Sequence, residues 1–110
     1  MEITRINDGL YKAVGQDKSI FLIVAPISGD ARKGPLAEAE RLAKLLELQV
    51  KLNDDWSMSV VMPTTGLTTK REIRKPVDEA PDGAIVVILC KNAGIHRAAI
   101  RLVEAGHATQ

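Results

Sequence analysis

Two short loops combine glycine, cations and the expected start of a helix, a combination that favours an anion. Each follows an apolar run and precedes an amphipathic segment; the loops read SGDARKG at 28–34 and CKNAGIHR at 90–97. At a helix start, backbone N–H groups without helical partners and the positive end of the helix dipole both attract negative charge. Arg32 with Lys33, or Lys91 with Arg97, would supply the countercharge. The loops are candidate phosphate sites, although a strand-to-helix turn also uses glycine and polar caps for structural reasons alone.

Three single side chains add candidate chemistry, each with a structural alternative. Trp56 offers a flat apolar face on which a base would stack, or it covers the edge of the core. His96 stands in an expected first helical turn, where it would contact an anion or exchange a proton, or simply lie exposed. Cys90 is the only cysteine, and the positive end of a helix would lower the pKa of its thiol, whereas burial would leave it inert.

Charge and composition narrow the classes of partner. The formal net charge is +1 and only 3% of the residues are aromatic, so neither bulk electrostatics nor a stacking platform draws the chain to nucleic acid. A local cluster of cations at 70, 71, 74 and 75 suits phosphate or single-stranded nucleic acid, or forms a solvated helix face. The longest apolar run, 20–27, is too short to cross a bilayer. With a single cysteine and no leader pattern, we expect a cytoplasmic protein without a membrane partner.

The loops with candidate chemistry need strands and helices to position them. Residues 20–25 and 84–89 are continuously apolar and rich in β-branched side chains, which is typical of parallel strands covered on both faces. Pro26 should end the first strand. The first helix is expected from Pro35, with apolar positions 36, 39, 42, 43, 46 and 50 on one stripe. The last is expected to be capped by Asn92, with apolar positions 95, 98, 99, 102 and 103, and to end at Gly106.

The rest of the chain gives weaker patterns. Residues 1–19 predict either a hairpin turning at 7–9 or a fraying helix, 49–52 predicts a short strand, and 57–62 an extended segment. A loop is expected at 63–66. A helix should follow from Thr68 or Thr69 to Lys75, with Glu72 completing a capping box for Thr69. Pro76 should then interrupt this helix or start another turn. The order of these elements predicts one small three-layer Rossmann-like α/β domain over residues 1–110, with a mostly parallel sheet.

Several motifs, in their order along the chain, resemble the SLOG superfamily of Rossmann-like domains. The first loop of the family is matched by Ser28, Gly29, Ala31 and Arg32, and its Asp-Trp motif by Asp55-Trp56. The helix arginine of the family corresponds to Arg74. The two residues before an apolar strand correspond to Pro81-Asp82, and the last glycine corresponds to Gly94. The resemblance implies a pocket for a nucleotide or nucleotide-derived molecule, lined by backbone amides at 28–34 and 92–96. The residues expected to bind it are Ser28, Gly29, Arg32, Lys33, Gly34, Trp56, Arg74, Lys91, Asn92, Gly94 and His96.

The departures from the family pattern concern catalysis and the first strand. Ala98 stands where the LONELY GUY phosphoribohydrolases of this superfamily carry a catalytic glutamate, so we expect binding without turnover, with no cofactor and no metal. The family's first strand should precede residue 20, and residues 1–19 carry no convincing copy of it, so the fold looks truncated at its N-terminus. Two alternatives stay open: an N-glycosidic or phosphoribosyl hydrolase with a non-standard acid–base residue, and a homo-oligomer that covers an open sheet edge by self-association.

Changing Arg32 and Lys33 together to Ala tests the first loop. If this loop holds the phosphate, the double variant should bind more weakly any nucleotide that raises the melting temperature of the wild-type chain, because the countercharge is removed. Titration calorimetry with that nucleotide is the measurement. Equal affinity in the double variant would show that another loop holds the ligand.

Overall fold

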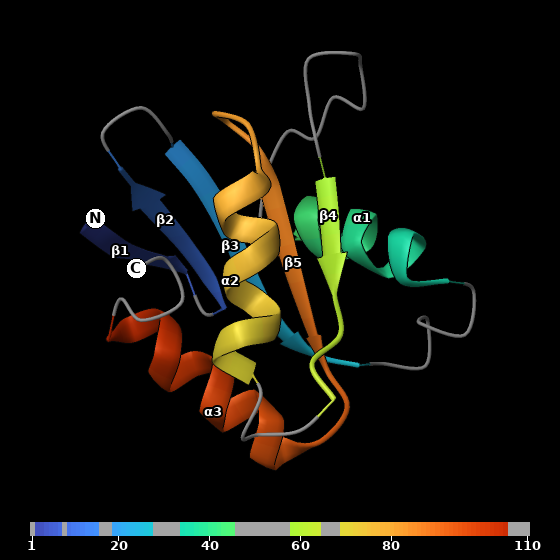
Figure 1. Cartoon of the computed structure of the whole chain (residues 1–110). Coiled ribbons are helices and arrows are strands. Elements are labelled where there is room, and N and C mark those ends of the chain that lie inside the picture. Colours follow the sequence, from blue (N-terminus) through green and yellow to red (C-terminus); the bar gives the residue numbers. More distant parts are fainter. Residues whose placement is uncertain are drawn as a thin grey trace.

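The computed structural model describes residues 2–7, 9–15, 19–27, 34–45, 58–64 and 69–105, which form a small α/β domain. Five strands make one mixed sheet in the order β1-β2-β3-β5-β4, and three helices accompany it (Figure 1). The strands are β1 (Glu2–Asn7), β2 (Leu10–Val14), β3 (Ser19–Pro26), β4 (Met58–Val61) and β5 (Ile85–Cys90). The helices are α1 (Pro35–Leu45), α2 (Thr69–Glu79) and α3 (Ala93–Glu104).

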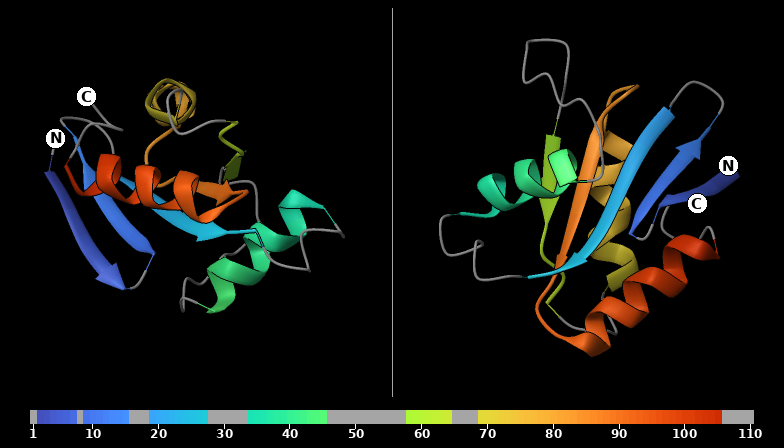
Figure 2. Two further views of the ribbon diagram at one scale, coloured as in Figure 1. Left: turned by 90° about the horizontal axis from the view of Figure 1, so that it is seen from below. Right: turned by 180° about the vertical axis from the view of Figure 1, so that it is seen from behind.

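The centre of the sheet is the parallel trio β3, β5 and β4. β5 pairs with β3 from Phe21↔Ile85 to Pro26↔Cys90, and with β4 on its other side. All six residues of β5 are buried, because helices cover both faces: α2 and α3 lie on one and α1 on the other (Figure 2). The two buried strands predicted from their continuous apolar runs are confirmed.

Alternate residues of these strands serve two separate cores, as the period of a strand requires. On the face of α2 and α3, Leu22 and Val24 of β3 join Val86 and Ile88 of β5. On the face of α1, the core contains Ile23, Ala25, Ile85, Val87 and Leu89, together with Ala39 and Leu42 of the helix. A strand buried this way carries no polar face, and this is why the runs read as uniformly apolar.

The N-terminal residues form a hairpin, one of the two structures expected for them. β1 and β2 are antiparallel, and β2 is antiparallel to β3. The sheet is therefore mixed, with a parallel core and an antiparallel flank, instead of mostly parallel. The hairpin lies beside β3, where an open edge was expected from the apparent truncation.

The helix after β5 follows its prediction. Asn92 is its N-cap, with extended backbone, and its side-chain oxygen accepts a hydrogen bond from the Ile95 N–H at 2.9 Å. Its buried residues are Ile95, Ala99 and Val103, and the predicted positions 98 and 102 are half-buried. The helix ends at Glu104, with Ala105 as C-cap; Gly106 and the predicted strand at 49–52 lie outside the described residues.

The prediction that Pro76 interrupts its helix is wrong. α2 continues through Pro76 to Glu79. Proline removes one helical hydrogen bond, but Ile73, Val77 and Ala80 on either side of it are buried against the sheet, and their packing holds the helix together. Glu72 accepts hydrogen bonds from the backbone N–H and hydroxyl of Thr64 at 3.0 and 2.8 Å; its expected capping box involves the Thr69 side chain, which lies outside the described part of the chain. Glu72 thereby ties the segment after β4 to the first turn of α2.

The described helices include none that is long and apolar enough to cross a membrane.

Replacing Gly9 with Ala should destabilise the domain more than the same change at Gly83. Both glycines have positive φ, 81° and 79°, so both substitutions cost backbone strain of about 1 kcal/mol or more. Only at Gly9 would the new Cβ meet a backbone atom, the Val24 carbonyl oxygen at 2.8 Å, while nothing lies within 4 Å of it at Gly83. We expect the Gly9 variant to lose about 2 to 4 kcal/mol of unfolding free energy in urea titrations. Equal losses at the two positions would mean that close packing of the hairpin against β3 is unimportant.

Candidate functional site

The carboxyl ends of β3 and β5 lie side by side. Pro26 and Cys90 are paired in register, and the Ile27 N–H donates to the Cys90 carbonyl oxygen at 3.0 Å. Both chain segments with candidate anion sites therefore leave the sheet at the same end, the carboxyl end of the parallel strands. The helices that follow them begin on opposite faces, α1 behind the sheet and α3 in front of it (Figure 1, Figure 2).

The structure brings together one group of the predicted site residues. Lys91, Asn92, Gly94 and His96 lie in the turn after β5 and the first turn of α3. Gly34 lies at the start of α1, on the other face of the sheet. The remaining members of the first loop and the Asp-Trp motif, namely Ser28, Gly29, Arg32, Lys33 and Trp56, lie outside the described residues.

Arg74 belongs to a different part of the surface. It lies exposed on α2 and forms an ion pair with Asp78 one turn later, with 3.7 Å between Nε and Oδ2. Both side chains are more than half exposed, so this pair adds little stability.

Asn92 has a structural task in the turn after β5. Its side-chain oxygen accepts from the Ile95 N–H, and its carbonyl oxygen accepts from the His96 N–H at 3.0 Å. These two amides of the first turn are therefore already satisfied. Lys91 and Gly94 are exposed beside them, so an anion at this turn would meet Lys91 and the earliest amides of the helix.

A cleft of about 460 Å³ runs along α3, between this helix and the strands β1, β2 and β3. Figure 2 shows α3 lying across these strands. Its apolar lining includes Val24, Pro26 and Ile100. Its polar side chains come from three elements: Arg5 of β1, Tyr11 of β2, and His96 and Glu104 of α3.

The cleft presents both kinds of hydrogen-bonding group and both signs of charge. The Tyr11 hydroxyl donates to Glu104 Oε1 at 3.2 Å, which orients the carboxylate at the end of α3. Tyr11 itself is 2% exposed, so its ring is part of the core and only its hydroxyl reaches the cleft. Arg5 supplies a guanidinium cation, and His96 supplies a ring whose nitrogens form hydrogen bonds. Among the predicted site residues, His96 is the one that lines this cleft.

Arg5, Tyr11 and Glu104 were not identified from the sequence. Tyr11 and Glu104 are 93 residues apart, and they meet because β2 pairs with β3 while α3 packs across both. One signal was present: His96, Ile100 and Glu104 recur every four residues and so share one stripe of the helix. The partner strand for that stripe was ambiguous, because residues 1–19 predicted a hairpin or a helix equally.

A second carboxylate, Glu38, is fully buried in the first turn of α1. Arg41 forms a two-pronged ion pair with it, at 2.7 Å from Nη2 to Oε1 and 3.2 Å from Nε to Oε2. Burying a charge is costly unless it is paired in this way. Glu38 lies on the face opposite the cleft and takes no part in it.

Cys90 is inert in this fold. The side chain is fully buried at the end of β5, and burial raises the pKa of its thiol to about 11. The hypothesis that the start of α3 lowers this pKa is therefore wrong, because desolvation of the thiolate dominates over the helix dipole. Among the described residues, no three His, Cys, Asp or Glu side chains gather to hold a metal ion.

No protein-family model, curated protein or solved structure matches this chain.

The stability of the domain should fall between pH 9 and pH 11 because of Cys90. The unfolded thiol, with the ordinary pKa of 9.0, loses its proton in this window, while the folded thiol, with a pKa of about 11, keeps it. The unfolded chain then binds fewer protons, so unfolding free energy drops, by about 2 to 3 kcal/mol over the window. Urea titrations of wild type and Cys90→Ala measure the effect as the pH-dependent part of their difference. A constant difference across the window would contradict the assignment.

Proposed function

We propose that this Rossmann-like, SLOG-type domain binds a small nucleotide-derived molecule in the cleft along α3 and does not turn it over. The cleft itself is the observation that carries the proposal. It lies near the carboxyl end of β3, the end at which open α/β sheets place their ligands. Its volume of about 460 Å³ falls within the range of small-molecule pockets.

The groups that line the cleft suit the parts of a nucleotide. Arg5 offers a planar, two-pronged donor for phosphate, with the ring of His96 as a further polar group on the helix side. The Glu104 carboxylate accepts hydrogen bonds, as ribose hydroxyls or a base amino group would offer them. Ile100, Val24 and Pro26 provide the apolar surface against which a base would pack.

Binding without turnover is favoured by the residue at position 98. The phosphoribohydrolases of the SLOG superfamily use a glutamate at that place in the family pattern, and here Ala98 is a half-buried residue of α3. An alanine neither gives nor takes a proton. Glu104, the carboxylate of the cleft, is held by the Tyr11 hydroxyl at 3.2 Å, an arrangement that suits a fixed acceptor for a bound ligand.

Thermal-shift screening with the four ribonucleoside monophosphates and inorganic phosphate tests the proposal. A nucleotide at about 100 times its Kd should stabilise the chain by about 2.7 kcal/mol, a shift of several degrees for a domain of this size. Arg5→Ala and Glu104→Gln should each weaken binding about tenfold or more, because each removes a charge-assisted hydrogen bond. Arg101→Ala is the matched control, since Arg101 is exposed on the same helix and is not among the residues that line the cleft.

Two results would contradict the proposal. One is the absence of any shift with all five compounds. The other is an equal loss of affinity in the control and the cleft variants. Chromatography of the same samples after overnight incubation should show intact nucleotide, and free base in amounts that depend on His96 would establish hydrolysis instead.

A further inference from the structure

The two edges of the sheet differ in how they are protected against pairing. The outer strand β1 carries Glu2 and Arg5 and has an irregular register between Arg5 and Asn7, the features that natural proteins use to block an edge. β4, at the other edge, reads Met58-Ser59-Val60-Val61 and carries neither a charge nor a proline. Among the described strands, β4 pairs only with β5. Within the part of the chain that the structure describes, the unprotected edge of this sheet is therefore β4.

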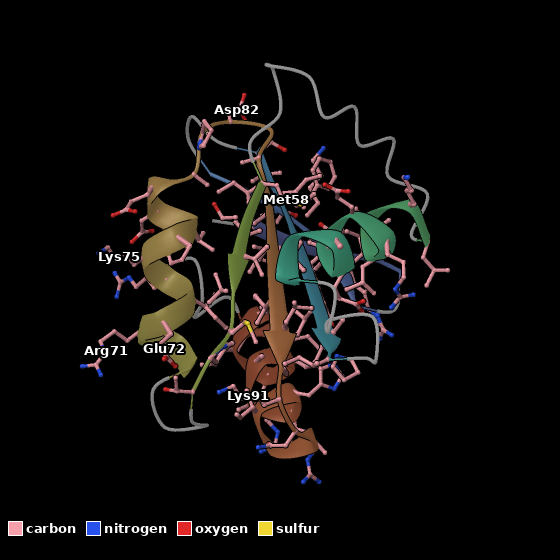
Figure 3. All side chains as sticks on the ribbon, turned by 90° about the vertical axis from the view of Figure 1, so that its right-hand side faces the viewer. Met58, Arg71, Glu72, Lys75, Asp82 and Lys91 are labelled. Carbon is pink, nitrogen blue, oxygen red and sulfur yellow. The ribbon has the colours of Figure 1, made fainter. Side chains whose placement is uncertain are left out.

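A groove of about 410 Å³ lies between β4 and α2. Figure 3 looks onto this edge, with β4 in front, α2 with the labelled Lys75 on one side, and α1 on the other. Ser59 and Val60 form the strand side of the groove. Lys75, Pro76 and Glu79 are on the helix side, so one cation and one anion stand a single helical turn apart.

These two charges are placed against the preferences of the helix that carries them. Glu79 is the last residue of α2, whose last turn has no basic residue, and a carboxylate there faces the negative end of the helix dipole. A lysine four residues before a glutamate is also the weaker order for a pair within one helix. Both side chains are exposed. The positions of Lys75 and Glu79 therefore add little to the stability of α2 itself. The two charges are, however, complementary to the same two charges of a second α2 that lies antiparallel to the first.

We propose that β4 is the seam of a homodimer, in which two copies pair β4 with β4 antiparallel about a two-fold axis and continue one sheet across both subunits. The axis then passes beside α2 near Val77, midway between Lys75 and Glu79. Because a two-fold repeats every contact, Lys75 meets Glu79 of the partner subunit, and Glu79 meets Lys75 of the partner subunit. The half-buried Met58 and Val60 side chains lose their remaining solvent at the seam.

A second copy suits this edge better than an unrelated extended peptide does. β4 has only four residues, and Pro63, two residues after its end, cannot donate to a longer ladder. A peptide added to so short a strand gains few main-chain hydrogen bonds, whereas a second copy adds the contact between the two α2 helices. The seam lies at the sheet edge opposite the hairpin that borders the α3 cleft. A result that contradicts the dimer therefore leaves the ligand proposal standing, and the reverse is also true.

Sedimentation of the full chain from micromolar to submillimolar concentration tests the dimer. We expect a species of twice the 11.9 kDa chain mass, with a Kd that rises with salt as screening weakens the two ion pairs. Lys75→Glu and Glu79→Lys alone should each raise the Kd tenfold or more, because each sets like charges against each other twice. An equimolar mixture of these two variants should dimerise again, since every cross-subunit contact is then of opposite sign.

Asp78→Lys is the matched control, on the same helix but outside the groove, and should leave the Kd within twofold. Circular dichroism of each variant checks that α2 and the sheet are intact. A wild-type chain that stays monomeric up to submillimolar concentration overturns the proposal. A monomer that binds an extended peptide at β4 overturns it as well. A dimer indifferent to both charge reversals, or a mixture of the two variants that fails to associate, also overturns it.

Discussion

The whole domain depends on burying β5 from both sides. This strand has six residues, and every one of them is buried. A strand without a polar face has no stable place at a surface, because its apolar side chains point in both directions. It therefore needs a neighbouring strand on each edge and helices on each face, which β3, β4 and the three helices supply. The central position of β5 in the sheet follows from this one requirement.

The antiparallel hairpin extends that arrangement and creates the cleft. By pairing with β3, β2 places Tyr11 in the core shared with α3, and only its hydroxyl reaches out to Glu104. Gly9 allows the hairpin turn to lie close to β3, with the Val24 N–H donating to the Gly9 carbonyl oxygen at 2.8 Å. The polar groups of the cleft are thus held in place by elements that already pack for apolar reasons.

The cleft and the unprotected edge occupy opposite ends of the strand order. The hairpin strands and β3 border the cleft, whereas β4 ends the sheet on the other side of β5. In a dimer joined at β4, the two clefts face away from each other and each is built by one subunit. Occupancy of one cleft then has no direct contact through which to affect the other, so any coupling between them would have to pass through the shared sheet.

Much of the fold was predictable from local patterns, because those patterns reflect physics within a few residues. Continuous apolar runs indicated β3 and β5, since only strands covered on both faces tolerate them. Asn92 indicated the start of α3, because its side chain satisfies an amide three residues away. The continuation of α2 through Pro76 was not predictable, because burial of Ile73 and Val77 outweighs a local defect and burial is a property of the assembled core.

The sequence alone determined the two buried strands β3 and β5, the helix that follows each of them, and which residue types stand at the ends of these strands. Only the tertiary structure decided that His96 shares a cleft with Arg5, Tyr11 and Glu104, because these residues come from opposite ends of the chain. It also decided that Cys90 is inert, since desolvation depends on what surrounds the thiol. The tertiary structure also decided which edge strand of the described sheet lacks protection. Strand order depends on the whole sheet, so no short stretch of residues determines it.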